Sequence, residues 1–317
     1  MVGLDEVWMR ELIDEVLSIT ESRKSESPQS NLKRTRVCTG IARPWLAKHF
    51  GFSLLDYYRV PSVCLRGQLL TKILRAKELD DDNLIRPMVG VDLGVALEPS
   101  LFGVEPVFQE GADPTFGDPV IRERADLDKL ELPDFFQSGY MPHIHRMYEE
   151  IQGLVDGDLQ VTFPGFARGP WSVACMLRGF TQLYMDLIDA PEFVHRLMQF
   201  ITDSKIKYEK DRAKFLGIDL NCPDRPTWKY VYADYREVDV SDLYNDEVDG
   251  ALFSPATYEE FIFPYEEQIA REFGGIRYYH SCGNLTSFAP IICKLPGLRI
   301  FHLSAWTDLG RVLDLLP

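Results

Sequence analysis

The chain has 317 residues, of which 45% are hydrophobic, and its 49 acidic and 34 basic side chains give a net charge of −15. This length suits one large core or two ordinary ones. The acidic balance argues against nucleic acid or an anionic membrane as a partner, because both would repel such a surface.

The sequence also indicates an intracellular, cytoplasmic protein. No run of eighteen or more apolar residues is present, and the N-terminus carries acids where a signal peptide would carry basic residues. Its six cysteines lack CxxC spacing in a chain too long to depend on disulfides, so we expect reduced thiols.

The first 36 residues form a separate unit in this prediction. Residues 4–20 have the apolar spacing of an amphipathic helix, and residues 22–31 are a polar Ser/Pro linker. We therefore expect an N-terminal helix and linker at 1–36, followed by one domain at 37–317.

Short apolar segments alternate with helical patterns throughout the second unit. Residues 85–92 are predicted to form a strand that ends at Asp92, and residues 97–121 predict turns and short hairpin strands. Pro170 and Pro255 are each placed in the first turn of a helix, the second behind Ser254 as N-cap.

Further elements follow from the same patterns. Helices are expected at 62–77, 140–154, 180–188, 191–215, 266–273 and 288–294, and strands at 159–166, from 217–219 onward, at 276–282 and at 298–306. Strands alternating with helices predict a parallel sheet, with functional groups at the strand C-termini. Asp92 is the first acid in such a position.

An acidic segment precedes Ser254. Asp242, Asn245, Asp246 and Glu247 either line a pocket or belong to a solvated loop, and the sequence leaves both interpretations open.

The clearest chemical signal lies in GGIRYYHSCGN, residues 274–284. On a strand, Tyr278, His280 and Cys282 share one face, with the last two about 6.6 Å apart at Cα. An imidazole and a thiolate favour zinc. Two ligands do not complete a site, and the alternative is a buried structural thiol beside a hydrogen-bonded histidine.

Four segments in sequence order resemble the uroporphyrinogen decarboxylase superfamily, and the similarity extends from about residue 37 to the last residue. They are VGVDLGVALEPSLFGVEP, GFARGPWSVACMLRG, DGALFSPATYEEFIFPY and HLSAWTDL. The resemblance implies an α/β fold, the (β/α)₈ TIM barrel, here with the N-terminal helical extension. It also implies either cofactor-free porphyrinogen decarboxylation or zinc-dependent methyl transfer between corrinoid proteins and thiols.

The motif YYHSCGN is similar to that of the zinc-dependent methyltransferase branch and to the zinc motif of cobalamin-independent methionine synthase. The resemblance thus implies His280 and Cys282 as metal ligands. Asp92, Asp246 and Tyr278 are the candidate catalytic residues, the acids to orient substrate or accept a proton and Tyr278 to shape the pocket.

Three departures from the family qualify this interpretation. Met176 stands where a decarboxylase tyrosine is expected, and RPWLAKHFGFSLLDYYR matches the arginine-rich substrate loop poorly. Family members also continue beyond the position of Pro317, so we expect a barrel without its last βα segment. The second cysteine ligand of the zinc branch comes from that region, and Cys293 and His302 are weak in-chain substitutes.

We therefore expect a methyltransferase that moves a methyl group between a corrinoid, or a methylated small molecule, and a zinc-activated thiol. One alternative is a metal-free decarboxylase of a uroporphyrinogen-like polycarboxylate, and another is a non-catalytic barrel that binds a corrinoid protein. The expected partners are a small-molecule substrate, a corrinoid protein and a second copy of the chain.

Overall fold

A computed structural model describes residues 2–22, 37, 39–79, 81–83, 85–218, 229–231, 237–239, 243–247 and 252–315. The predicted linker, the strand expected after Ile218 and Asp242 lie outside these residues. Within the described segments, no helix is both long and apolar enough to cross a bilayer.

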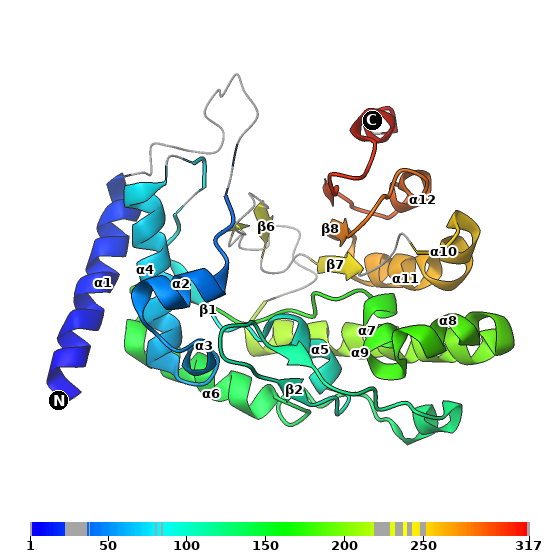
Figure 1. Ribbon diagram of the computed structural model, residues 1–317, viewed down its shortest axis with the longest axis horizontal. Helices are drawn as coiled ribbons and strands as arrows, with labels where there is room; N and C mark the ends of the chain where they lie inside the picture. Colours follow the sequence, from blue (N-terminus) through cyan, green and yellow to red (C-terminus); the bar gives the residue numbers. More distant parts are fainter. Residues whose placement is uncertain are drawn as a thin grey trace.

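The fold alternates helices and short strands, as the sequence pattern predicts (Figure 1). The helices are α1 Val2–Ser22, α2 Arg43–Phe50, α3 Leu54–Tyr57, α4 Pro61–Glu78, α5 Leu97–Ser100, α6 Met141–Val155, α7 Pro170–Arg178, α8 Phe180–Asp189, α9 Pro191–Phe215, α10 Pro255–Phe261, α11 Phe263–Phe273, α12 Ala289–Ile292 and α13 Leu309–Leu313. Two 3₁₀ helices are η1 Gly94–Ala96 and η2 Arg124–Lys129.

The strands that build the interior pair in parallel. They are β1 Met88–Gly90 with β4 Gln160–Thr162, and β7 Leu243–Glu247 with β8 Ile276–Ser281 and β9 Ile300–His302. The antiparallel pair β2 Pro106–Val107 and β3 Thr115–Phe116 confirms the predicted hairpin, and β5 Lys229–Val231 pairs with β6 Glu237–Asp239. Strand β7 lies in the acidic segment, for which the sequence predicts a pocket lining or a solvated loop and not a strand.

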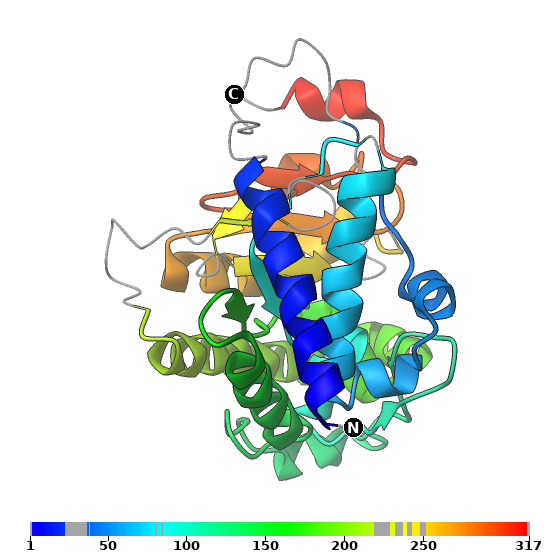
Figure 2. The same ribbon diagram turned by 90° about the vertical axis from the view of Figure 1, so that its left-hand side faces the viewer.

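The N-terminal helix packs along α4, as Figure 2 shows. Among residues 7–22 of this helix, the buried side chains that face α4 and the core include Met9, Leu12, Ile13 and Val16. The guanidinium of Arg66 lies 4.3 Å from the centre of the Trp8 ring, a cation–π contact across the same interface. The helix thus covers the outer face of α4.

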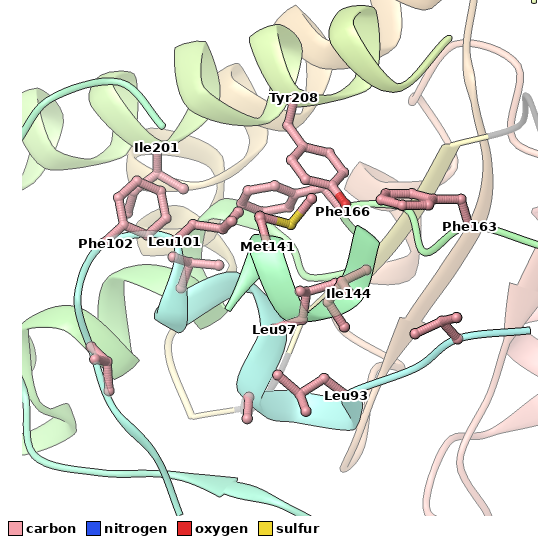
Figure 3. Close-up of a cluster of buried hydrophobic side chains, with 14 of the residues drawn as sticks. Leu93, Leu97, Leu101, Phe102, Met141, Ile144, Phe163, Phe166, Ile201 and Tyr208 are labelled. Atoms are coloured by element: carbon pink, nitrogen blue, oxygen red, sulfur yellow. The ribbon is translucent and has the colours of Figure 1, made fainter. Parts of the chain in front are cut away.

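A large apolar cluster joins α5, α6 and α9 (Figure 3). Ile201 of α9 lies beside Phe102, and Tyr208 of the same helix lies over Phe166 in the loop after β4. The Tyr208 hydroxyl also donates to the Pro164 carbonyl at 2.9 Å. Helix α9 therefore fixes the loop that follows β4.

A substitution at Gly139, in the turn before α6, tests how closely this turn packs against α5. Its φ is +53°, and an added Cβ would lie 1.9 Å from the Ser100 carbonyl oxygen. We expect Gly139→Ala to lower the free energy of unfolding by about 2–4 kcal/mol, because strain and backbone overlap act together. Chemical denaturation measures the change.

Gly153 provides the control, because it lies within α6 and a Cβ there meets nothing within 4 Å. Gly153→Ala is expected to raise stability by about 0.5–1 kcal/mol. Equal denaturation midpoints for the two variants would contradict the assigned turn.

Candidate functional site

A cavity of about 460 Å³ opens at the C-terminal ends of β1, β4 and β7. This volume lies in the lower part of the range of about 300–1,000 Å³ that is common for small-molecule sites. Its charged lining residues are Arg43, Lys72, Asp92, Glu98, Arg168, Glu209, Arg212 and Asp246.

Asp92 lies in this cavity, two residues after β1, where the sequence places it. It accepts a hydrogen bond from Arg43, which also donates to the Tyr58 hydroxyl at 2.7 Å and lies 3.5 Å from Asp113. Burial lowers the pKa of Arg43, but the Asp92 carboxylate and its neighbours outweigh this effect and raise it well above the ordinary value. The Arg43 guanidinium therefore stays charged beside Asp92.

Asp246 joins the cavity to the second group of strands. Its carboxylate lies 3.1 Å from the Arg168 guanidinium, and its backbone bonds to Ala167 and Gly169 at 3.0 Å each way. The loop after β4 thus continues into β7 through a parallel bridge. The acidic segment is a strand, and Asp246 is part of the cavity wall.

Glu247 points to the opposite face of β7 and is 1% exposed. It accepts hydrogen bonds from the N–H groups of Trp171 and Ser172 at 3.1 and 2.8 Å, and from the Ser172 hydroxyl at 2.9 Å. A carboxylate at the first turn of α7 complements the helix dipole. An added Cβ on Gly169 would lie 2.1 Å from this carboxylate, so the close approach requires glycine.

A second buried network holds β7 and β8 on their back face, which is the face opposite to the side chains of Asp246 and His280. Asn245 donates to Glu266 at 2.6 Å, Tyr258 also donates to Glu266, and the Tyr258 and Tyr279 hydroxyls are 3.1 Å apart. Burial, reinforced by Glu247, raises the pKa of Glu266 well above its ordinary value. These contacts determine which side chains of the two strands face forward.

His280 and Cys282 face forward, toward the side of the strands that carries Asp246, as the strand alternation predicts. The Cys282 sulfur lies 3.5 Å from His280 Nε2. Ligand bonds of about 2.3 Å to sulfur and about 2.0 Å to nitrogen, at a tetrahedral angle, place the two donor atoms about 3.5 Å apart. The pair therefore fits two positions of a zinc site.

The other side chains near His280 lie farther away. His280 Nε2 lies 3.9 Å from Asp246 Oδ1, and the His302 ring stacks on His280 with centroids 4.5 Å apart. Across the described segments, no three His, Cys, Asp or Glu side chains are close enough together to form a complete metal cluster. Cys293 follows α12, where burial raises the pKa of its thiol.

Tyr278 is fully buried and does not line the cavity. Its hydroxyl lies 2.7 Å from His302 Nδ1. It therefore supports the ring that stacks on His280.

Sequence reasoning did not identify several of the cavity residues. Arg43, Lys72, Glu98 and Arg168 each come from an element other than the strands that carry the predicted site. Only Arg168 had a local signal, because it precedes the Gly-Pro start of a helix.

The strand ends, the cavity and the intervening helices define an α/β protein with a site at the C-terminal face of its parallel strands. The family described as Uroporphyrinogen decarboxylase (URO-D) matches residues 54–214, and the chain belongs to this family.

Two curated relatives illustrate the extent of the match. The uroporphyrinogen decarboxylase of Xanthomonas axonopodis pv. citri (strain 306) is 29% identical over 180 residues, covering 55% of this chain and 43% of the relative. That of Xylella fastidiosa (strain Temecula1 / ATCC 700964) is 26% identical over 263 residues, covering 76% and 65%. The chain therefore spans less than two thirds of either relative.

A solved structure titled methyltransferase from Methanosarcina mazei has a similar fold. The TM-score is 0.59 at 15% sequence identity, covering 92% of this chain and 75% of that one. This similarity shows the shared URO-D-like fold, which is a TIM barrel.

Glu247 predicts a pH dependence of stability. Burial raises its pKa from 4.5 to about 7, against the opposing hydrogen bonds from Ser172 and Trp171. The folded state binds the proton of the Glu247 carboxyl group more tightly than the unfolded state does. The contribution of Glu247 to the free energy of unfolding therefore falls as the pH rises from about 4.5 to about 7. We expect the stability advantage of the parent over Glu247→Gln to shrink by on the order of 1–3 kcal/mol between about pH 5 and pH 7.5.

Urea denaturation across this pH range measures the difference. Glu259→Gln, at an exposed position of α10, should leave the pH profile of the parent unchanged. A parent-minus-variant difference that stays constant with pH would show that Glu247 has an ordinary pKa.

Proposed function

We propose that the chain is a methyltransferase that moves a methyl group between a corrinoid, or a methylated small molecule, and a thiol. The observation that carries this proposal is the His280–Cys282 pair, with donor atoms 3.5 Å apart, beside an acid that lines the cavity. Membership of the URO-D family and the fold shared with a methyltransferase support it.

His280 and Cys282 would hold a zinc ion as two of its ligands, and Asp246 Oδ1 lies 3.9 Å from His280 Nε2 beside them. Zinc, when bound, lowers the pKa of a thiol so that a thiolate persists near neutral pH. In the transfer, the sulfur electron pair forms the new S–CH₃ bond, and the pair of the broken Co–CH₃ bond stays on the corrinoid.

The other residues of the site orient groups and carry protons. Arg168 holds the Asp246 carboxylate in place at 3.1 Å, and Tyr278 holds the His302 ring against His280. Asp92, fixed by Arg43, is the carboxylate within the cavity that orients the substrate or accepts the thiol proton. The corrinoid is a substrate in this proposal, either free or carried by a partner protein in the cytoplasm.

Decarboxylation of a polycarboxylate is the second candidate. It is favoured by the Arg43–Asp92 pair in the cavity and by the name of the curated relatives. The volume of about 460 Å³ favours a smaller substrate. Release of carbon dioxide from uroporphyrinogen by the purified chain distinguishes this candidate.

Demethylation of methylcobalamin tests the main proposal. With 2-mercaptoethanol as acceptor, we expect a thiol-dependent spectral change that the parent catalyses and Cys282→Ser slows by about 100-fold or more, because a ligand is lost. Cys293→Ser is the matched control, since that thiol lies at the end of α12, and it should retain the parental rate. A parent no faster than buffer, or an unchanged Cys282→Ser, would contradict the proposal.

A further inference from the structure

The arginines of the cavity are neutralised by the protein itself. Arg168 pairs with Asp246 at 3.1 Å, and Arg212 pairs with Glu209 at 2.9 Å. Arg43 pairs with Asp92 and lies 3.5 Å from Asp113. A ligand therefore meets little free positive charge at these three side chains.

Lys72 differs from the arginines. It lies on α4, is half-buried and lines the same cavity. Within the part of the chain that the structure describes, Lys72 forms no ion pair with a carboxylate and no side-chain hydrogen bond. Its neighbour Arg75 is already paired with Asp81 at 3.1 Å.

The environment of Lys72 disfavours its charge. Burial, with a smaller contribution from Arg75, lowers the pKa of its ammonium to about 8. A charged group removed from water is costly unless a counter-charge is supplied. An anionic ligand in the cavity would supply it.

The side-chain hydrogen bonds that join α4 to Gly90 of β1 do not involve Lys72. One turn earlier on α4, Gln68 donates to the Gly90 carbonyl at 2.8 Å and accepts from the Gly90 N–H at 2.9 Å. These bonds already dock α4 onto β1. The side chain of Lys72 is therefore available for a ligand.

We propose that Lys72 is the anion-binding group of the cavity and that the substrate is a small acid whose single carboxylate pairs with its ammonium. This assignment rests on the proposed methyl transfer and names the substrate class of the same site. One uncompensated cation in a cavity of about 460 Å³ suits one carboxylate, whereas a polycarboxylate macrocycle needs several free cations. The reacting sulfur or methyl group would then face the Asp246 wall.

Competitive labelling tests binding without relying on turnover. Acetic anhydride modifies the Lys72 amine, and mass spectrometry of the peptide reports the extent of acetylation. We expect 3-mercaptopropionate to slow labelling of Lys72 about tenfold at saturation, and its neutral analogue 3-mercaptopropionamide to leave it unchanged. Equal protection by both compounds, or by neither, would overturn the assignment.

Kinetics with the same two thiols as methyl acceptors give the second measurement. Lys72→Met should raise the KM for the acid about tenfold and leave the KM for the amide and the kcat unchanged, because one charge-assisted hydrogen bond is lost. Lys72→Arg should restore most of the preference. Lys77→Met is the control, since Lys77 is exposed on the same helix and pairs with Glu15.

The two hypotheses fail in different ways. Methyl transfer to acid and amide with the same KM in the parent and in Lys72→Met would overturn the role of Lys72 and leave the methyltransferase proposal intact. Selective protection of Lys72 by the acid without any methyl transfer would support the carboxylate site and count against the reaction.

Discussion

The parallel pairing of β7 with β8 is the constraint on which the site depends. Asp246 lies opposite His280 in this register, and both side chains face forward. The next residue, Glu247, faces backward and caps α7. Consecutive residues thus perform two tasks, and a register shift of one residue would exchange them.

Helix α9 provides the second constraint, because its polar side chains hold the loop after β4. Lys205 donates to the Arg168 carbonyl at 2.9 Å, and Glu209 accepts from the Phe166 N–H at 2.6 Å. Burial lowers the pKa of Lys205 to about 8, against the opposing effect of nearby glutamates. The position of Arg168, and through it Asp246, therefore depends on α9 as well as on the strands.

Much of the fold follows from the sequence because hydrophobic periodicity and the residues that begin or end helices are local features. The alternation in IRYYHSC predicted the forward face of β8, and Pro170 and Pro255 marked helix starts that the structure confirms. The sequence does not predict strand β7 because LYNDE is polar, and its Asn245 and Glu247 side chains bond to distant groups, Glu266 and Ser172. The partners of Arg43 and the isolation of Lys72 depend on contacts between distant segments, which no local pattern reveals.

Metal analysis tests the central assignment most directly. Elemental analysis of the purified chain, expressed with zinc supplied, should give close to one zinc ion per chain for the parent and almost none for Cys282→Ser. This result would establish His280 and Cys282 as ligands of a bound zinc ion. Absence of zinc from both proteins, or equal zinc in both, would contradict the account and leave the pair as an ordinary part of a strand.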